Sequence, residues 1–204
     1  DAPALLNHAI VNCIDVEKWE RDRTGKKLTE IGLSTFAVSD MHAVKNNGPR
    51  GENLLKRMWF YHYRIIPYAH LINGRFCEGN PTKNHFGTTC FIDLDEAKRM
   101  LESAFKWPTK GGTAEPFSPV IFLGHALRGD IKMLRDAYNL PKSTFDMVVK
   151  TIDTQDMAPA VGLWHGKNKI SLLNLCAYND FDFADPHTAG NDAAYTMISA
   201  VFMV

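Results

Sequence analysis

Apolar and polar positions alternate along the chain with two different periods, which predict strands in some segments and helices in others. Runs of short or β-branched apolar residues predict strands at 9–17, 28–38, 88–92, 120–123 and 147–152, and 68–76 fits a further strand. Apolar residues spaced three and four apart predict helices at 53–63, 95–105, 130–138, 170–178 and 192–204. Asp93 or Asp95 would cap the second of these helices, and Ser171 the fourth.

The order of these elements predicts an α/β fold with a mixed central sheet flanked by helices. A short polar turn joins 9–17 to 28–38, so we expect an antiparallel meander at the start of the sheet. The run at 120–123 is continuously apolar, which is typical of a strand covered on both faces, and 147–152 is expected to be another buried strand. A helix between the two strands favours parallel pairing. We expect a single domain over residues 1–204.

The stretch from 40 to 87 is the least regular part of the chain. It holds the breaker-rich loop 46–51 and a turn at 80–84. Because it is long for a simple connection between strands, we expect an insertion with its own structure. A second irregular point, Gly111-Gly112-Thr113, predicts a flexible link.

Composition sets only broad bounds on function. The 204 residues are enough for one sizeable domain, and Lys+Arg and Asp+Glu each number 23, so net charge gives no hint of nucleic acid. The apolar segment 193–204 is too short to span a bilayer, so we expect no membrane association. The chain begins at Asp1 close to a strand and stops inside a predicted helix. We therefore expect a domain of a longer protein, whose missing flanks could bind a protein partner.

The four cysteines indicate an intracellular protein. Cys13, Cys77, Cys90 and Cys176 are scattered without C-x-x-C spacing, so free thiols in a reducing compartment, the cytoplasm or the nucleus, are expected. A zinc site made by Cys77, His85 and Cys90 is conceivable, but no spacing rule supports it.

An acidic pair stands at the end of the first predicted strand. Side chains alternate faces along a strand, so Asp15 and Glu17 emerge on the same side, about 7 Å apart, while Val16 points into the core. Two carboxylates on a largely buried strand repel each other unless a cation lies between them, and oxygen ligands suit Mg²⁺ or Mn²⁺. The alternative is that Glu17 lies past the strand end in solvent, beside Lys18.

Two later segments offer matching polar side chains. Asp130 follows the tip of the strand 120–123 and starts a helix, which is where open α/β sheets place their sites. Pro186 and Gly190 suggest that His187 lies on the loop entering the last helix and Asp192 in its first turn, so that both face one pocket. The alternatives are that Asp130 and Asp192 only cap their helices and that the histidine is solvated.

Together, these segments resemble the signature of the DEDDh exonuclease family in order and spacing. The motifs are Asp15-x-Glu17, then His125-x-x-x-x-Asp130, then His187-x-Ala189-x-x-Asp192. Residues 28–32 resemble the family's second strand and 152–154 its later Asp-Thr step, so the likeness covers 9–38 and 120–204. Segments 36–42, 70–71, 86–87 and 187–195 most resemble a fungal group of DEDDh-type domains, some linked to RNA silencing or mRNA export. Ala126 stands where the family usually has Asn, and Arg128-Gly129 replaces an apolar or aromatic pair.

The resemblance implies an RNase H-like fold and 3′-to-5′ hydrolysis of single-stranded RNA or DNA with a free 3′ end. Two cations, Mg²⁺ or Mn²⁺, would hold the attacking water and the leaving oxygen. The resemblance implies that Asp15 bridges both, that Glu17 and Asp192 hold the ion carrying the water, and that Asp130 supports the second. Histidine titrates near neutral pH, so His187 could take the proton from that water.

Other polar residues near these motifs are predicted to have supporting roles. His125, Asp153 and Glu30 are expected to be structural or substrate-edge residues. The alternative function is a catalytically silent adaptor with this fold that binds RNA or a protein partner.

Cations and aromatic rings are mixed in the predicted insertion. Lys56, Arg57 and Arg64 lie among Trp59, Phe60, Tyr61 and Tyr63, a combination that could bind phosphates and stack on bases. The alternative is that the rings form the insertion's own core, with the cations solvated outside it.

Overall fold

The computed structural model describes residues 4–109 and 116–204 and is built on a six-stranded sheet with the strand order β4-β3-β2-β1-β5-β6. The strands are β1 (Ile10–Lys18), β2 (Leu28–Ala37), β3 (Trp59–Ile65), β4 (Thr89–Ile92), β5 (Val120–Gly124) and β6 (Val148–Asp153). β2 runs antiparallel to β1 and β3, while β4, β5 and β6 each pair parallel to a neighbour. The predicted mixed sheet is therefore confirmed. The predicted link at Gly111-Gly112-Thr113 lies outside the described residues.

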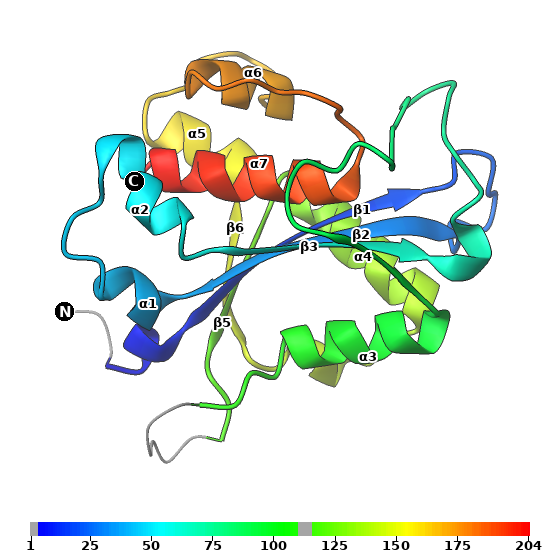
Figure 1. Ribbon diagram of the computed structural model, residues 1–204, viewed down its shortest axis with the longest axis horizontal. Coiled ribbons are helices and arrows are strands. Elements are labelled where there is room, and N and C mark those ends of the chain that lie inside the picture. Colours follow the sequence, from blue (N-terminus) through cyan, green and yellow to red (C-terminus); the bar gives the residue numbers. More distant parts are fainter. Residues whose placement is uncertain (1–3, 110–115) are drawn as a thin grey trace.

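Helices cover both faces of this sheet (Figure 1). They are α1 (Val38–His42), α2 (Glu52–Leu55), α3 (Leu94–Ala104), α4 (Leu127–Tyr138), α5 (Thr154–Ala160), α6 (Leu172–Tyr178) and α7 (Ala189–Phe202). Single 3₁₀ turns lie at η1 (Ala4–His8), η2 (Pro49–Gly51), η3 (Ile66–Tyr68) and η4 (Lys142–Phe145). α7 crosses β1 and β2, with α5 and α6 above it, and α3 and α4 cover the opposite face. None of the helices in the described ranges has the length and hydropathy needed to cross a membrane.

The alternation along β1 decides which residues face which layer. Ile14 and Val16 are buried in the cluster shared with α3 and α4. Val11 and Cys13 are buried in the other cluster, with Met197 of α7. Asp15 and Glu17 continue the second set, so both carboxylates lie on the face that α7 covers.

Two helix starts follow the predicted capping chemistry. Asp93 and Glu96 form a reciprocal capping box at the start of α3, and the Ser171 hydroxyl accepts from the backbone N–H of Asn174 at the start of α6. The predicted helices at 95–105 and 170–178 and the predicted strand at 88–92 are confirmed.

Two predictions between 40 and 87 are wrong. The segment 53–63 is not one helix, because α2 ends at Leu55 and Trp59 begins β3, which pairs with β2 in the centre of the sheet. β-Branched and aromatic side chains pack well on a pleated sheet, and here that preference overrides the helical spacing. The segment 68–76 is not a strand: Ile66–Tyr68 forms a 3₁₀ turn and an irregular loop follows. Part of the predicted insertion therefore belongs to the central sheet.

Candidate active site

The carboxyl end of β1 and the amino-terminal ends of α4 and α7 meet at one end of the sheet (Figure 1). Asp15 and Glu17 lie on β1, opposite Gly32 and Glu30 of β2. Asp130 lies in the first turn of α4 and Asp192 in the first turn of α7, and both are buried. His187 lies on the loop that enters α7, with a positive φ of 56°. Three separate segments thus bring four carboxyl groups and one imidazole together.

The closest part of this cluster is made by Glu17, His187 and Asp192. Each offers one ligand atom, and the three atoms lie within 4.8 Å of one another. Nδ1 of His187 is 3.8 Å from Oε1 of Glu17, and the backbone N–H of His187 donates to Oδ2 of Asp192 at 3.0 Å. This hydrogen bond fixes the histidine loop to the first turn of α7.

Burial and mutual repulsion make the carboxyl groups hard to ionise. Burial, followed by the negative charges of Asp130 and Asp192, holds the pKa of Asp15 well above its usual range. Burial, followed by the charge of Asp192, does the same to the pKa of Glu17. Burial raises the pKa of Asp130 to about 8 and that of Asp192 to about 7. Each of these carboxyl groups therefore keeps its proton to a higher pH than an exposed carboxyl group does.

The donor set fits a hard divalent cation. Oδ1 of Asp192 is buried and has no hydrogen-bond partner among the described residues. An orphaned, buried carboxylate oxygen is costly unless an ion or water satisfies it, and Mg²⁺ and Mn²⁺ prefer carboxylate oxygens. In the described ranges, no metal-binding group is formed by Cys77, His85 and Cys90, and all four cysteines are free thiols.

The position of α7 depends on close contacts with β2 and β3. The buried carboxylate of Glu30 accepts hydrogen bonds from the backbone N–H of Ala189, at 3.2 Å, and from Nε2 of His62, at 2.9 Å. A side chain at Gly32 would overlap the carbonyl oxygen of Ala189, and one at Gly190 would overlap the Asn84 side chain. The pairing of Glu30 with His62 has no signal in the sequence, because the two residues lie on different strands.

The turn between β5 and α4 is held by a second network. The Asp153 carboxylate accepts from the backbone N–H groups of Ala126 and Leu127, at 3.1 and 3.0 Å. Nδ1 of His125 lies 2.8 Å from the Thr154 hydroxyl. His125 and Asp153 thus hold the turn from which Asp130 projects.

The three predicted substrate-binding cations do not lie together. Lys56 and Arg57 follow α2, which lies beside the C-terminal end of α7, the opposite end from Asp192 (Figure 1). Arg64 is buried on β3, where its guanidinium donates to the carbonyl oxygen of Ala69 and lies 5.4 Å from the ring of Phe91. These internal contacts occupy the guanidinium of Arg64.

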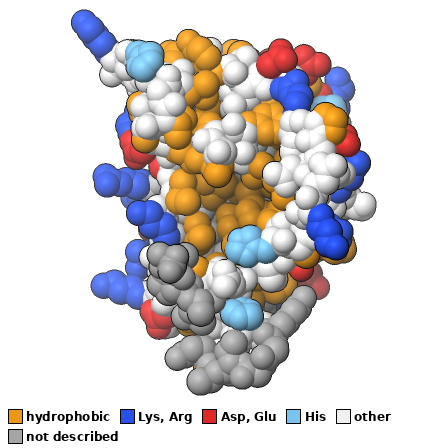
Figure 2. All heavy atoms as spheres, turned by 90° about the vertical axis from the view of Figure 1, so that its left-hand side faces the viewer, with side chains coloured by type: hydrophobic (Ala, Val, Ile, Leu, Met, Phe, Trp, Pro, Cys, Tyr) orange, Lys and Arg blue, Asp and Glu red, His pale blue; other side chains and the backbone are white. Residues whose placement is uncertain are grey.

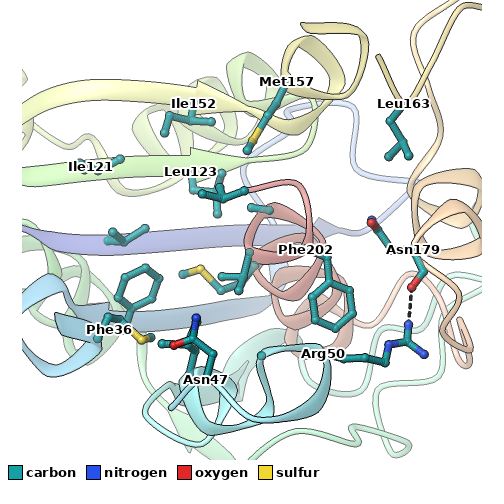
Figure 3. A pocket seen from close by; sticks show the side chains of 18 of the residues that line it. Phe36, Asn47, Arg50, Ile121, Leu123, Ile152, Met157, Leu163, Asn179 and Phe202 are labelled. Atoms are coloured by element: carbon teal, nitrogen blue, oxygen red, sulfur yellow. Dashed lines mark hydrogen bonds between the residues drawn. The ribbon is translucent and has the colours of Figure 1, made fainter. Parts of the chain in front are cut away.

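An apolar cavity lies away from the carboxylates. It has a volume of about 1050 Å³ and opens between α2 and the α5–α6 side, where apolar side chains line a hollow (Figure 2). Its floor includes Leu123 and Ile152, and Arg50 on its rim donates to the carbonyl oxygen of Asn179 at 2.6 Å (Figure 3). Since no carboxylate of the cluster lines it, the cavity is separate from the candidate active site.

Solved structures and curated proteins resemble this chain over most of its length. The zinc-bound form of an E. coli ExoI–ssDNA complex superposes with a TM-score of 0.54 at 13% identity, covering 96% of this chain and 40% of that one. The likeness supports the RNase H-like exonuclease fold. An uncharacterized Saccharomyces cerevisiae protein, YDR514C, is 26% identical over 211 residues, which are 94% of this chain and 40% of that protein. An uncharacterized nucleolar protein of Schizosaccharomyces pombe, C2C4.08, is 26% identical over 190 residues, which are 90% of this chain and 64% of that protein.

The family assignment rests on nearly the whole chain. Residues 10–203 match the family DEDDh_C, described as DNA polymerase III subunit epsilon-like, C-terminal domain. This range includes all four carboxylates, His187, and every strand of the sheet. The chain belongs to the DEDDh 3′-5′ exonuclease family.

Proposed function

We propose that this domain, over residues 1–204, is a divalent-metal-dependent 3′-5′ exonuclease that hydrolyses single-stranded RNA or DNA. The observation that carries the proposal is the convergence of four carboxyl groups from β1, α4 and α7 beside an exposed histidine. Buried acids with raised pKa values and an orphaned oxygen are arranged for cations, and a structural core gains nothing from such a cluster.

Asp15, Glu17, Asp130 and Asp192 would hold two Mg²⁺ or Mn²⁺ ions. Bound there, the ions would supply positive charge to the attacking and leaving oxygens of a phosphodiester. The protein's own contribution is to fix these carboxylates on three rigid elements, since β1 is central in the sheet and both helices start at the site.

His187 is the group best suited to accept a proton from the attacking water. Its side chain is 45% exposed, so the ring can be reached from solvent, and Nδ1 lies 3.8 Å from Glu17. A neutral imidazole nitrogen can accept a proton, and the adjacent carboxylate would stabilise the imidazolium that forms.

The similar proteins support the substrate class and the compartment. The E. coli ExoI structure is a complex with single-stranded DNA, and the S. pombe relative is named as nucleolar. We therefore propose a nucleic acid strand as the substrate and the nucleus or cytoplasm as the compartment. The chain spans less than two thirds of both curated relatives, so a partner bound through further segments is part of the proposal.

End-labelled single-stranded RNA and DNA, incubated with Mg²⁺, Mn²⁺ or EDTA, test the proposal directly. We expect stepwise release of mononucleotides from the 3′ end in either metal and none in EDTA. Asp15→Asn keeps the shape of the side chain and removes a charge, so it should abolish cleavage while the protein still folds. Wild-type turnover in Asp15→Asn would refute the metal mechanism. Binding without cleavage by the wild-type protein would favour a silent adaptor.

A further inference from the structure

The loop between η3 and β4 presents an exposed aromatic ring beside the candidate active site. Phe76 is 74% exposed and Ile72 is 57% exposed, both on this loop. The guanidinium of Arg75 lies over one face of the Phe76 ring, 4.9 Å from its centre. A single exposed apolar residue is ordinary on a protein surface, so the meaning of this ring depends on how the loop is held.

One end of the loop is fixed to the strand that carries the catalytic carboxylates. The amide of Asn73 donates to the carbonyl oxygen of Lys18 at 2.7 Å, and its side-chain oxygen accepts from the backbone N–H of Glu20 at 2.9 Å. The Glu20 carboxylate then accepts from three consecutive backbone N–H groups, those of Gly74, Arg75 and Phe76, at 3.4, 3.2 and 3.0 Å. The hydrogen bond from the Phe76 N–H is the largest cause that lowers the pKa of Glu20, and those from Gly74 and Arg75 act in the same direction.

The other end of the loop passes against the histidine of the site. A side chain at Gly79 would overlap the carbonyl oxygen of His187. The Thr188 hydroxyl donates to the carbonyl oxygen of Asn80 at 3.1 Å. Between these two ends, burial and then the charges of Glu17 and Glu20 raise the pKa of the Cys77 thiol.

Phe76 therefore lies on a loop whose two ends are both fixed to segments of the candidate active site. The Phe76 backbone N–H donates to the carboxylate of Glu20, and Glu20 follows Glu17 by three residues, so the Cα atoms of the two glutamates are at most roughly 10 Å apart. The loop rises beside the β1–β2 turn and passes the start of α7 (Figure 1).

We propose that Phe76 and Arg75 form a stacking platform for a base near the 3′ end of a single-stranded nucleic acid. The guanidinium lies over one face of the ring, and 74% of the residue is exposed, so a base can stack on the ring while the cation attracts the phosphate backbone. Glu20 is the positioning residue, because its carboxylate orders the backbone of the platform. The inference rests on the proposed function, since it assigns part of the substrate to that site.

Equilibrium binding in EDTA separates this role from catalysis. A fluorescently labelled single-stranded oligonucleotide should bind Phe76→Ala about 10-fold more weakly than wild type, as expected for losing one base-aromatic stack. Phe76→Trp should bind as tightly as wild type, whereas Phe76→Leu, which keeps apolar area without a ring, should behave like the alanine variant. Trp59→Ala is the matched control, because Trp59 is 63% exposed at the far end of β3 and should bind normally.

Oligonucleotides with an abasic residue at the last or the next-to-last position identify the stacked base. When the base that stacks on Phe76 is missing, wild-type protein should bind the oligonucleotide more weakly by the same factor as Phe76→Ala binds the intact one. Phe76→Ala should then bind the abasic oligonucleotide no more weakly than wild type does. Glu20→Ala, which removes the acceptor for all three backbone N–H groups, should also weaken binding about as much as Phe76→Ala. The platform would be refuted if Phe76→Ala weakened binding of the intact and the abasic oligonucleotides equally, or if it did not weaken binding at all. Either result would refute the platform even if the wild-type protein cleaves. Phe76-dependent binding without any cleavage would refute the proposed nuclease and leave the platform standing.

Discussion

His187 combines accessibility with a fixed backbone, which suits a group that exchanges protons with water. Its backbone N–H is bonded to Asp192 and its carbonyl oxygen packs against Gly79, while the ring remains partly exposed. We expect His187→Ala to slow cleavage roughly 10²–10⁴-fold, the usual loss for a general base. Single-turnover rates measured against pH should show partial recovery at alkaline pH, because hydroxide replaces the missing base. If His187→Ala instead lowered Mn²⁺ affinity in step with the rate, the histidine would be a metal ligand.

Ala126 is a strained residue next to the site. It adopts a left-handed conformation, with φ 60° and ψ 37°, just before α4. That region costs an alanine about 1–2 kcal/mol, whereas glycine and asparagine enter it easily. Ala126→Gly and Ala126→Asn should each raise the free energy of unfolding by about 1 kcal/mol, measured by denaturant titration.

The matched control for this prediction lies inside the following helix. Ala137 is within α4, where glycine is about 1 kcal/mol less favourable than alanine. Ala137→Gly should therefore destabilise the protein. If Ala126→Gly lowered the free energy of unfolding as much as Ala137→Gly does, the left-handed conformation of Ala126 would not be destabilising.

At the scale of elements, α7 is positioned by backbone contact with β2. A Cβ atom at Gly32 would collide with the backbone of Ala189, which cannot rotate away as a side chain could. Gly32→Ala should therefore displace the start of α7, lower stability by about 1–3 kcal/mol, and slow cleavage, because Asp192 and His187 move with the helix. Thermal unfolding and steady-state kinetics would check both effects.

Gly129 provides the comparison for Gly32. A Cβ atom there meets nothing within 4 Å, and the residue lies in the first turn of α4. Gly129→Ala should leave stability unchanged or raise it by up to about 1 kcal/mol. Wild-type stability and turnover in Gly32→Ala would show that α7 is not held by this contact.

The same elements show what the sequence alone can predict. The hairpin β1–β2, the buried strand β5 and the capped helix α3 have strong local patterns, and the structure confirms them. β6 forms where the sequence predicts a strand, but the prediction that it is buried is wrong, because β6 lies at the edge of the sheet and its residues are partly buried or exposed. The sequence pattern predicts β3 as part of a helix, because Leu55, Met58, Trp59 and Tyr63 also fit a helical spacing. Its burial depends on pairing with β2, which lies far away in the sequence.

The site is predictable to the extent that its motifs are local. The positions of Asp15, Glu17, Asp130, His187 and Asp192 at strand ends and helix starts follow from their flanking residues. The loop 72–80 gives no such signal, because its anchors join Asn73 to Lys18 and Thr188 to Asn80 across long sequence separations. Likewise, the role of Glu30 depends on His62 and Ala189, which only the fold brings to it.

For the whole molecule, the acidic cluster ties stability to pH and to metal. The folded-state pKa values of Asp130, about 8, and Asp192, about 7, lie above the value of about 4 expected in the unfolded chain. Asp15 and Glu17 are shifted in the same direction. Between about pH 4 and pH 8 the folded protein therefore binds more protons than the unfolded chain, and the stability of the metal-free form should fall as pH rises through this window.

A divalent cation should reverse this loss, because it compensates the same charges that protons neutralise. We expect Mn²⁺ to raise the thermal midpoint more at pH 8 than at pH 6 relative to EDTA, with about 2–4 °C for each kcal/mol of stabilisation. Asp15→Asn carries one acid fewer, so its metal-free stability should depend less on pH and its midpoint should respond less to Mn²⁺. The His187→Ala variant is the control, since it keeps all four carboxylates and should retain most of the Mn²⁺ response. A midpoint that rises with pH in EDTA, or a Mn²⁺ response that Asp15→Asn leaves intact, would show that the carboxylates do not act as one cation site.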